Sequence, residues 1–289
     1  MKEEKVKKVF GEQEYQKHIL NCQKEYLKLS DQTKAILWGL VLGDGSIKIH
    51  KGYKHARLSF RHSTTQQEYF EWKRDQLRPE LSASAHDTWE QTVPEKSEEY
   101  GKQKLRYQSG AKPSLTYIYY LTHKGSERDE IKIWRTWLNE MTPLSLAVWW
   151  CDDGSLVGNA SQGIFCTDGF GEENVRVLDR YMKMKWGITT TIMTTGKYTK
   201  TGIERYRLTI KTHEDLKKFL RIIMPYIPTQ SMLKKVLLLY NDADLQQRWI
   251  SEMVTHTTYQ REQLEELCET RKAQYKAFKS ENDIVHSPK

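Results

Sequence analysis

Two apolar runs mark the chain, and each leads directly into an acidic residue followed by glycine. The runs occupy residues 36–42 and 144–151. Because apolar residues lie on every side of both segments, they predict helices that are buried all round. Ser30 before the first run is typical of a helix N-cap, and Pro143 before the second is typical of a first helical turn.

Alternating polar and apolar residues after the first run predict a half-buried sheet. In segment 56–62, Arg57, Ser59 and Arg61 share one face, and Leu58 and Phe60 share the other. A period of two with one basic face indicates a strand. The following residues predict a helix at 68–77, a hairpin formed by 104–108 and 116–121, and a helix at 131–138.

The same order recurs after the second run. It predicts a strand at 163–167, a helix at 172–186, a strand pair within 187–211 and a helix at 213–224. A repeat of mixed helices and strands predicts an α+β fold with two similar halves. We expect an N-terminal helical extension at 1–30, halves at 31–140 and 141–240, and a charged helical tail at 241–289.

The charge of the chain favours a polyanionic partner. Lys plus Arg is 46 and Asp plus Glu is 38, which gives a net charge of +8. Segments 45–67, 101–126 and 183–203 contain no acidic residue, although an ordinary solvated sheet would carry both signs. Two-stranded ribbons fit the major groove of DNA. The candidate DNA-binding residues are Lys48, Lys51, Lys54, Arg57, Arg61, Lys104, Arg106, Lys112, Lys197, Lys200, Arg205, Arg207 and Lys211.

The four cysteines and the N-terminal residues indicate the cellular compartment in which the protein is expected. None of the cysteines forms a CxxC pair or lies at zinc spacing from a histidine cluster, so buried free thiols in a reducing compartment are favoured. The charged N-terminal residues do not resemble a secretory signal, and no apolar stretch is long enough for a membrane span. We expect no membrane partner and an intracellular location, in a bacterial cytoplasm or an organelle.

Asp44 and Asp153 are the candidate chemical groups. Each follows an apolar helix and precedes a glycine. If the two helices pack side by side, the two carboxylates meet, and Gly39 and Gly43 would let the helix backbones approach closely. A carboxylate pair at helix C-termini, where the dipole is also negative, favours a divalent cation, and oxygen ligands suit magnesium. The alternative for either copy alone is a simple helix-ending turn.

The two runs resemble the paired motifs of LAGLIDADG homing endonucleases in their single-chain, two-motif form. They read LWGLVLGDG at 37–45 and LAVWWCDDG at 146–154, and the resemblance extends over about residues 31–240. The preceding TPLS at 142–145 is similar to the intron-encoded subgroup. Trp38, Gly43, Val148 and Trp149 depart from the consensus, whereas both acidic positions are kept.

The resemblance implies αββαββα halves, with two sheets that form a saddle over DNA and a monomer that cuts both strands. It implies two or more Mg²⁺ ions, which Mn²⁺ can replace, bound at Asp44 and Asp153 with the preceding Gly43 and Asp152 in the metal-binding set. A basic residue is expected in each half near the cut phosphate. The candidates are Lys234 in the second half and Lys132, with Lys124 as its rival, in the first; Thr64 and Asp168 are candidates for positioning water.

Three functions remain open on the sequence. The first is a site-specific endonuclease, which retention of Asp44, Asp153 and Lys234 favours. The second is an RNA-splicing maturase on the same fold, with intron RNA as its partner. The third is a DNA-binding regulator that does not cleave, which would be free to lose both aspartates.

Overall fold

A computed structural model describes residues 2–81, 88–91, 104–124, 130–158, 160–198, 202 and 204–285. The first sheet unit contains seven main elements in the order αββαββα. They are α2 (Asp31–Leu42), β1 (Ser46–Lys48), β2 (Arg57–Ser63), α3 (Gln67–Leu81), β3 (Thr88–Gln91), β4 (Lys104–Gln108) and α4 (Pro113–His123). A short 3-10 turn, η1 (Thr64–Gln66), joins β2 to α3.

The second sheet unit repeats this order. Its elements are α6 (Pro143–Asp153), β5 (Gly154–Val157), β6 (Gln162–Phe165), α7 (Gly171–Tyr181), β7 (Thr191–Tyr198), β8 (Glu204–Ile210) and α8 (His213–Ile223). A short helix, α5 (Arg135–Leu138), precedes it. One π-helical turn and two 3-10 turns complete it: η2 (Met182–Trp186), η3 (Met224–Tyr226) and η4 (Gln230–Lys235).

Three further helices lie outside the two sheet units. They are α1 (Lys2–Leu27), α9 (Ala243–His256) and α10 (Arg261–Val285). Helix α1 packs against α4, and α9 contacts α10 and η3. Among the helices of the described residues, none combines the length and the apolar character that crossing a membrane would require.

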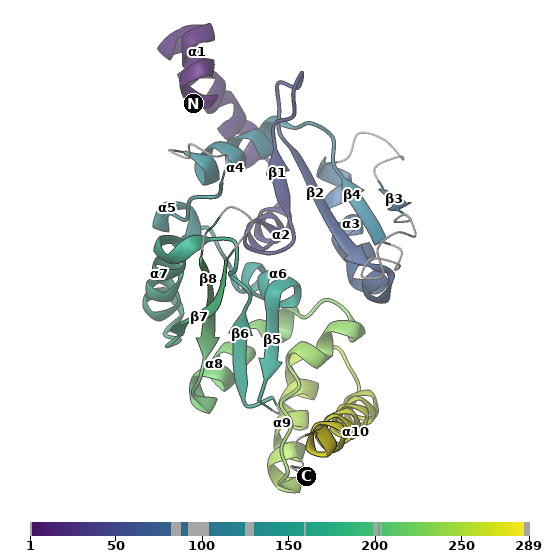
Figure 1. The fold of residues 1–289 in the computed structure, drawn as a ribbon. Helices are drawn as coiled ribbons and strands as arrows, with labels where there is room; N and C mark the ends of the chain where they lie inside the picture. Colours follow the sequence, from purple (N-terminus) through teal and green to yellow (C-terminus); the bar gives the residue numbers. More distant parts are fainter. Residues whose placement is uncertain are drawn as a thin grey trace.

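The two sheets have the same strand arrangement. Their orders are β1-β2-β4-β3 and β5-β6-β8-β7, and all pairs of neighbouring strands are antiparallel. This repeated order confirms the predicted pair of αββαββα units. In Figure 1 the two sheets lie on either side of α2 and α6, which occupy the centre of the molecule.

The central helices approach closely because glycine occupies the contact. Ser30 caps α2 by accepting a hydrogen bond from the Thr33 amide, and every residue from Ala35 to Leu42 is buried. A Cβ atom on Gly39 would lie 2.6 Å from the Ser145 carbonyl oxygen of α6 and 2.6 Å from the Val148 Cβ. Such distances are well inside van der Waals contact, so a larger residue would push the two helices apart.

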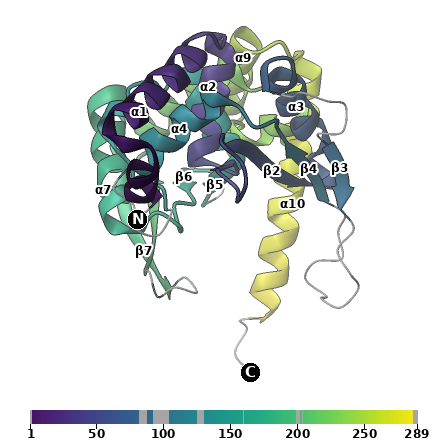
Figure 2. The same ribbon diagram turned by 90° about the horizontal axis from the view of Figure 1, so that it is seen from above.

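Each sheet has one buried face and one open face. In the first sheet, Ile47, Leu58, Phe60 and Tyr107 are buried, and the polar residues between them point to the other side. Seen from above, the helices form an arch over the two sheets, whose other faces line the opposite side (Figure 2). Helix α10 projects on that side, away from the arch.

Two sequence predictions were wrong in the first unit. Segment 116–121, expected as a strand, lies inside α4, because Leu115, Ile118, Tyr119 and Thr122 form a buried stripe with helical spacing. The aromatic and β-branched residues there favour a strand locally, but packing against α1 selects the helix. Of the helix expected at 131–138, only α5 (Arg135–Leu138) is helical.

Candidate active site

Asp44 and Asp153 lie at the C-terminal ends of the two central helices. Gly43 caps α2, Asp44 follows it, and Asp153 is the last residue of α6. The close contact at Gly39 holds these ends together, so that the negative charge of Asp44 raises the pKa of the Asp153 carboxyl. The structure therefore gives the two aspartates a common electrostatic environment, as the packing of the two motifs predicts.

Both carboxyls are difficult to ionise in the absence of a cation. Burial, followed by the charge of Asp152, raises the pKa of Asp44 to about 6. Burial, followed by the charges of Asp44 and Asp152, raises the pKa of Asp153 to about 7. Lys73 and Lys235 oppose both shifts without cancelling them. A site of this kind favours a bound divalent cation, because the cation would relieve the repulsion.

Asp152 forms a buried ion pair that sequence reasoning missed. Lys73 of α3 lies 2.7 Å from the Asp152 Oδ1, and both side chains are fully buried. The other carboxylate oxygen, Oδ2, accepts a hydrogen bond of 3.1 Å from the backbone amide of Asp44. Lys73 also lies over the rings of Tyr69 and Phe60. Asp152 thus fixes the backbone at Asp44, and nothing in the amphipathic pattern of α3 singles out Lys73.

Gly43 fits this arrangement because it has no side chain. A Cβ atom there would lie 2.5 Å from the Asp152 Oδ2. The departure from the motif consensus at Gly43 therefore leaves room for the Asp152 carboxylate. The two members of the expected metal-binding set that precede the aspartates pack directly against each other.

His62, at the end of β2, is a second residue that the sequence did not single out. Its Nδ1 lies 2.9 Å from the Gln66 Oε1 and 3.8 Å from the Asp44 Oδ2. Burial, followed by the charge of Lys73, lowers the pKa of His62 to about 4, so the ring is neutral at pH 7 and forms no ion pair with Asp44. Its Nε2 is buried and has no hydrogen-bond partner among the described residues.

Lys235, the neighbour of the predicted Lys234, is the second-half lysine whose charge lowers the pKa of both Asp44 and Asp153. Its Nζ donates a hydrogen bond to the carbonyl oxygen of Gly154, and its own carbonyl accepts one from the Trp150 indole. These two bonds fix the register of η4 against α6. Burial lowers the pKa of Lys235, while the nearby Asp152 and Asp153 charges raise it. Lys234 lies beside it in η4, and successive residues of a 3-10 turn point in different directions.

The first-half candidates lie elsewhere. Lys132 donates its backbone amide to Thr122 and lines a shallow pocket with residues 169–174, at the start of α7. Lys124 follows the C-terminal end of α4. Lys73 and Lys235, not these two residues, are the cations that lower the pKa of Asp44.

The two candidate water-positioning residues do not occupy corresponding places. Ser46 pairs with Ser59 and Ser155 pairs with Ile164, so the strand registers make Ser63, not Thr64, the counterpart of Asp168. Thr64 lies in η1. Asp168 accepts hydrogen bonds of 3.2 and 3.1 Å from the guanidinium of Arg207, which engages both of its carboxylate oxygens.

The residues present fit a magnesium-type ion. Ligand atoms of Asp44, His62 and Asp152 lie within 4.8 Å of one another, and Asp153 adds a further carboxylate whose charge interacts with that of Asp44. Carboxylate oxygens are hard ligands that suit Mg²⁺ and Mn²⁺. Oxygen donors, close spacing and raised carboxyl pKa values together indicate a cation site.

The open face of the first sheet carries five of the predicted basic residues. Lys48 pairs in register with Arg57, Arg61 with Arg106, and Ser63 with Lys104. Arg61 and burial both lower the pKa of Arg106, as expected when two like charges lie opposite each other. Lys51 and Lys54 are exposed in the β1–β2 connection, and Lys112 caps α4. A bound polyanion would remove the repulsion on this face.

The second sheet presents a less basic open face. Arg205 and Arg207 lie on β8, Lys197 is exposed on β7, and Lys211 is exposed just beyond β8. Arg207 is already paired with Asp168. Lys200 lies outside the described residues. Of the four cysteines, three are buried free thiols as predicted, and Cys166 is half-buried.

The raised pKa values of Asp44 and Asp153 predict that the metal-free protein becomes less stable as pH rises. Between pH 4 and 7 the unfolded chain loses protons that the folded Asp44 and Asp153 keep, so these groups make folding less favourable as pH rises. Asp153→Asn should therefore raise Tm at pH 8 relative to the wild type and have little effect at pH 4. A change of about 1 kcal/mol corresponds to roughly 2–4 °C. Thermal denaturation in EDTA measures this difference.

The comparison between variant and wild type matters because His62 acts in the opposite direction. Its lowered pKa makes the fold more stable as pH rises from about 4 to its ordinary value, and this contribution cancels in the difference. Asp244→Asn, a change at an exposed residue of α9, is the matched control and should leave Tm unchanged at both pH values. A lower Tm for Asp153→Asn at pH 8 would contradict the account of strained carboxylates.

Comparison with known proteins relates this chain to a family. The family model of the LAGLIDADG DNA endonuclease family matches residues 34–219. DNA endonuclease I-ChuI of Chlamydomonas applanata is 26% identical over 212 residues, which cover 70% of this chain and 93% of that protein. Cytochrome b mRNA maturase bI2 of Saccharomyces cerevisiae is 26% identical over 199 residues, which cover 67% of this chain. The aligned part makes up only 44% of the maturase's length.

A solved structure agrees with the fold. The homing endonuclease I-WcaI, bound to its DNA recognition sequence, superimposes with a TM-score of 0.60 and 25% sequence identity. The match covers 77% of this chain and 93% of that one. The family match spans both central helices and both sheets. This chain belongs to the LAGLIDADG DNA endonuclease family.

Proposed function

We propose that this chain is a site-specific homing endonuclease that makes a metal-dependent double-strand break in a long DNA target. It would hydrolyse one phosphodiester in each strand and act as a monomer, because one chain carries both motifs. The observation that carries the proposal is the pairing of Asp44 and Asp153 at the ends of packed helices, with both carboxyl pKa values raised. A binding protein would gain nothing from keeping two carboxyls that repel each other and the phosphates.

The residues of the site have different roles in the proposed reaction. Asp44 and Asp153 would hold Mg²⁺, with Gly43 and Asp152 shaping the site. Bound Mg²⁺ supplies polarisation of the phosphate and a more acidic water molecule. Asp152, held by Lys73, fixes the Asp44 backbone. Lys235 brings a positive charge to the Gly154 carbonyl, beside Asp153, where it can stabilise charge that develops on the phosphate.

The basic face of the first sheet supports DNA as the partner. Lys48, Arg57, Arg61 and Lys104 lie on one side of adjacent strands, where a ribbon in the major groove would present them to bases and phosphates. The relative I-WcaI binds DNA, which agrees with this assignment. We propose that binding weakens steeply with salt, because phosphate contacts release counterions.

The similarity to an mRNA maturase keeps a second function open. Cytochrome b mRNA maturase bI2 is 26% identical to this chain over 199 residues, so splicing of intron RNA is the alternative. A maturase or a non-cleaving DNA-binding protein would not need the aspartate pair. RNA binding could use other basic surfaces, such as the helical extensions.

Selection of cut molecules from a randomised DNA library tests the proposal. Full-length protein with Mg²⁺ should linearise circles that carry one defined long sequence, and EDTA should prevent it. The selected site should be cut in both strands. Absence of any cleaved sequence in Mg²⁺ and in Mn²⁺, with retained RNA or DNA binding, would favour the maturase or the non-cleaving protein.

Variants of the adjacent lysines Lys234 and Lys235 distinguish a role in catalysis from a role in phosphate binding. Lys235→Met should reduce the rate of cleavage at saturating protein by about 10- to 100-fold, since its charge lies beside Asp153. Lys234→Met should change the rate by less than about threefold. Single-turnover cleavage and filter binding measure the two effects. A larger rate loss for Lys234→Met than for Lys235→Met would make Lys234 the catalytic lysine and remove Lys235 from the site.

A further inference from the structure

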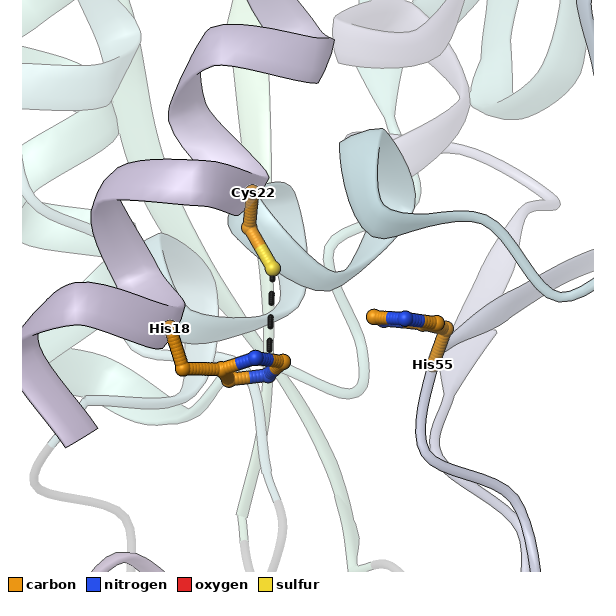
Figure 3. A group of neighbouring side chains, drawn as sticks. All are labelled: His18, Cys22 and His55. Carbon is orange, nitrogen blue, oxygen red and sulfur yellow. Dashed lines mark hydrogen bonds between the residues drawn. The ribbon is translucent and has the colours of Figure 1, made fainter. Parts of the chain in front are cut away.

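Three metal-binding side chains meet far from the aspartates, between α1 and the β1–β2 connection. His18 and Cys22 lie one turn apart on α1, and His55 comes from the segment just before β2. The Cys22 Sγ lies 3.8 Å from the His18 Nε2, and one ligand atom from each residue lies within 4.8 Å of the others. Figure 3 shows His55 facing the two helix side chains across the gap between the segments.

Their spacing is close to that of a tetrahedral zinc site. With Zn–S near 2.3 Å and Zn–N near 2.0 Å, tetrahedral ligand atoms are about 3.3–3.6 Å apart. The 3.8 Å between Cys22 and His18 is therefore slightly longer than a bound ion requires. The imidazole rings of His18 and His55 lie with their centroids 5.6 Å apart, so small side-chain rotations would bring the three donors onto one ion.

A hydroxyl group orients His55. Thr116 Oγ1 lies 3.3 Å from the His55 Nδ1, accepts a hydrogen bond from the Ala56 amide and donates one to the Lys112 carbonyl. When the hydroxyl hydrogen is directed to the Lys112 carbonyl, the His55 Nδ1 carries the proton in its bond to Thr116. This leaves the Nε2 as the basic nitrogen, and a polar partner of this kind typically orients a metal-binding histidine.

The protonation of the group suits a metal that displaces one proton. Burial, followed by the charge of Lys54, lowers the pKa of His18, and burial is the largest cause of the lowered pKa of His55. Both rings are therefore neutral at pH 7, which is the form that binds metals. Burial raises the pKa of the Cys22 thiol to about 11, so a metal would bind with release of the thiol proton. Lys54 would then lie beside a thiolate ligand.

We propose that His18, Cys22 and His55 bind a zinc ion, with water as a fourth ligand, and that this ion fastens α1 to the β1–β2 connection. Two imidazoles and one thiolate form a donor set that favours Zn²⁺ over Mg²⁺. The site is separate from the aspartate centre, and its occupancy does not depend on nuclease activity. The hairpin that it would anchor includes Lys51, Lys54 and Arg57.

Cobalt substitution tests this site directly. Full-length protein, reduced and stripped with EDTA, is titrated with Co²⁺ in excess Mg²⁺, which occupies the carboxylate centre. We expect one equivalent of Co²⁺ to give the intense near-ultraviolet band of a thiolate–cobalt bond and the visible bands of tetrahedral cobalt. One equivalent of Zn²⁺ should abolish both. Absence of the bands at stoichiometric Co²⁺ would overturn the proposal.

Matched variants locate the ligands. Cys22→Ser and His55→Ala should lose the near-ultraviolet band or weaken Co²⁺ binding at least tenfold, whereas Cys268→Ser and His50→Ala should retain it. Asp44→Asn should also retain it, which separates this site from the aspartate centre. A band that persists in Cys22→Ser would assign the metal to another cysteine and refute the site. If Cys22→Ser does not fold, the rate of Cys22 alkylation in the wild-type protein, measured with and without Zn²⁺, tests whether Cys22 binds the metal. Zn²⁺ should slow this alkylation, and an unchanged rate would contradict zinc binding.

Discussion

Asp153→Asn should reduce DNA cleavage by at least about 100-fold, because loss of a residue that only supports a metal ligand already costs about 10- to 100-fold. The neutral amide cannot supply the carboxylate charge that would hold the cation, and the geometry of α6 should be unchanged because the two side chains have nearly the same shape. Binding of the selected target should stay within a few-fold of wild type. It should become slightly tighter in EDTA, where one repulsive charge has been removed. Single-turnover cleavage and filter binding measure the two effects.

Asp44→Asn should give the same separation of cleavage from binding. The two aspartates lie at equivalent ends of α2 and α6, so loss of either should affect both strands if they share bound ions. Asp244→Asn, at an exposed position of α9, should cleave at the wild-type rate. Wild-type cleavage by either aspartate variant would remove that residue from the site.

Lys73→Met should destabilise the protein by about 3–5 kcal/mol, because it leaves the Asp152 carboxylate buried without its ion-pair partner. For a protein of this size the fall in Tm is on the order of 10 °C. The methionine matches the length of the lysine stem and keeps contact with Phe60 and Tyr69, so the loss reports on charge rather than on packing. Thermal or urea denaturation measures it.

An exposed ion pair provides the control for Lys73. Lys217 and Glu214 of α8 form a pair on the surface, and Lys217→Met should lower stability by less than about 1 kcal/mol. The double variant Lys73→Met/Asp152→Leu should recover part of the loss, because neither charge then remains buried. Equal effects of Lys73→Met and Lys217→Met would show that the buried pair does not hold the centre together.

Sequence patterns predicted the parts of the fold that depend on local periodicity. Uniformly apolar runs located α2 and α6, Gly39 indicated their close contact, and alternating residues located β2 and the basic face of its sheet. The repeated order of elements predicted two similar sheets. These features follow from side-chain periods of 3.6 and 2, which a single sequence displays directly.

The features that sequence patterns did not predict depend on tertiary contacts. Lys73 lies in an ordinary amphipathic helix, and only packing of α3 against α6 brings it to Asp152. Lys235 reaches the Gly154 carbonyl because two hydrogen bonds set the register of η4, which no local sequence period displays. Segment 116–121 is helical because α1 covers it. The sequence does not bring out the group of His18, Cys22 and His55, because two of these residues come from one helix and the third from the β1–β2 connection.

Diffraction from crystals of the protein with its selected target and Mn²⁺ tests the central claim most directly. Anomalous scattering should reveal Mn²⁺ between the ends of α2 and α6, within about 2.2 Å of carboxylate oxygens of both Asp44 and Asp153 and next to the phosphates that are cut. Mn²⁺ that binds neither aspartate while the DNA is cut would contradict the account. The aspartates would then be structural residues, and another site would perform the cleavage.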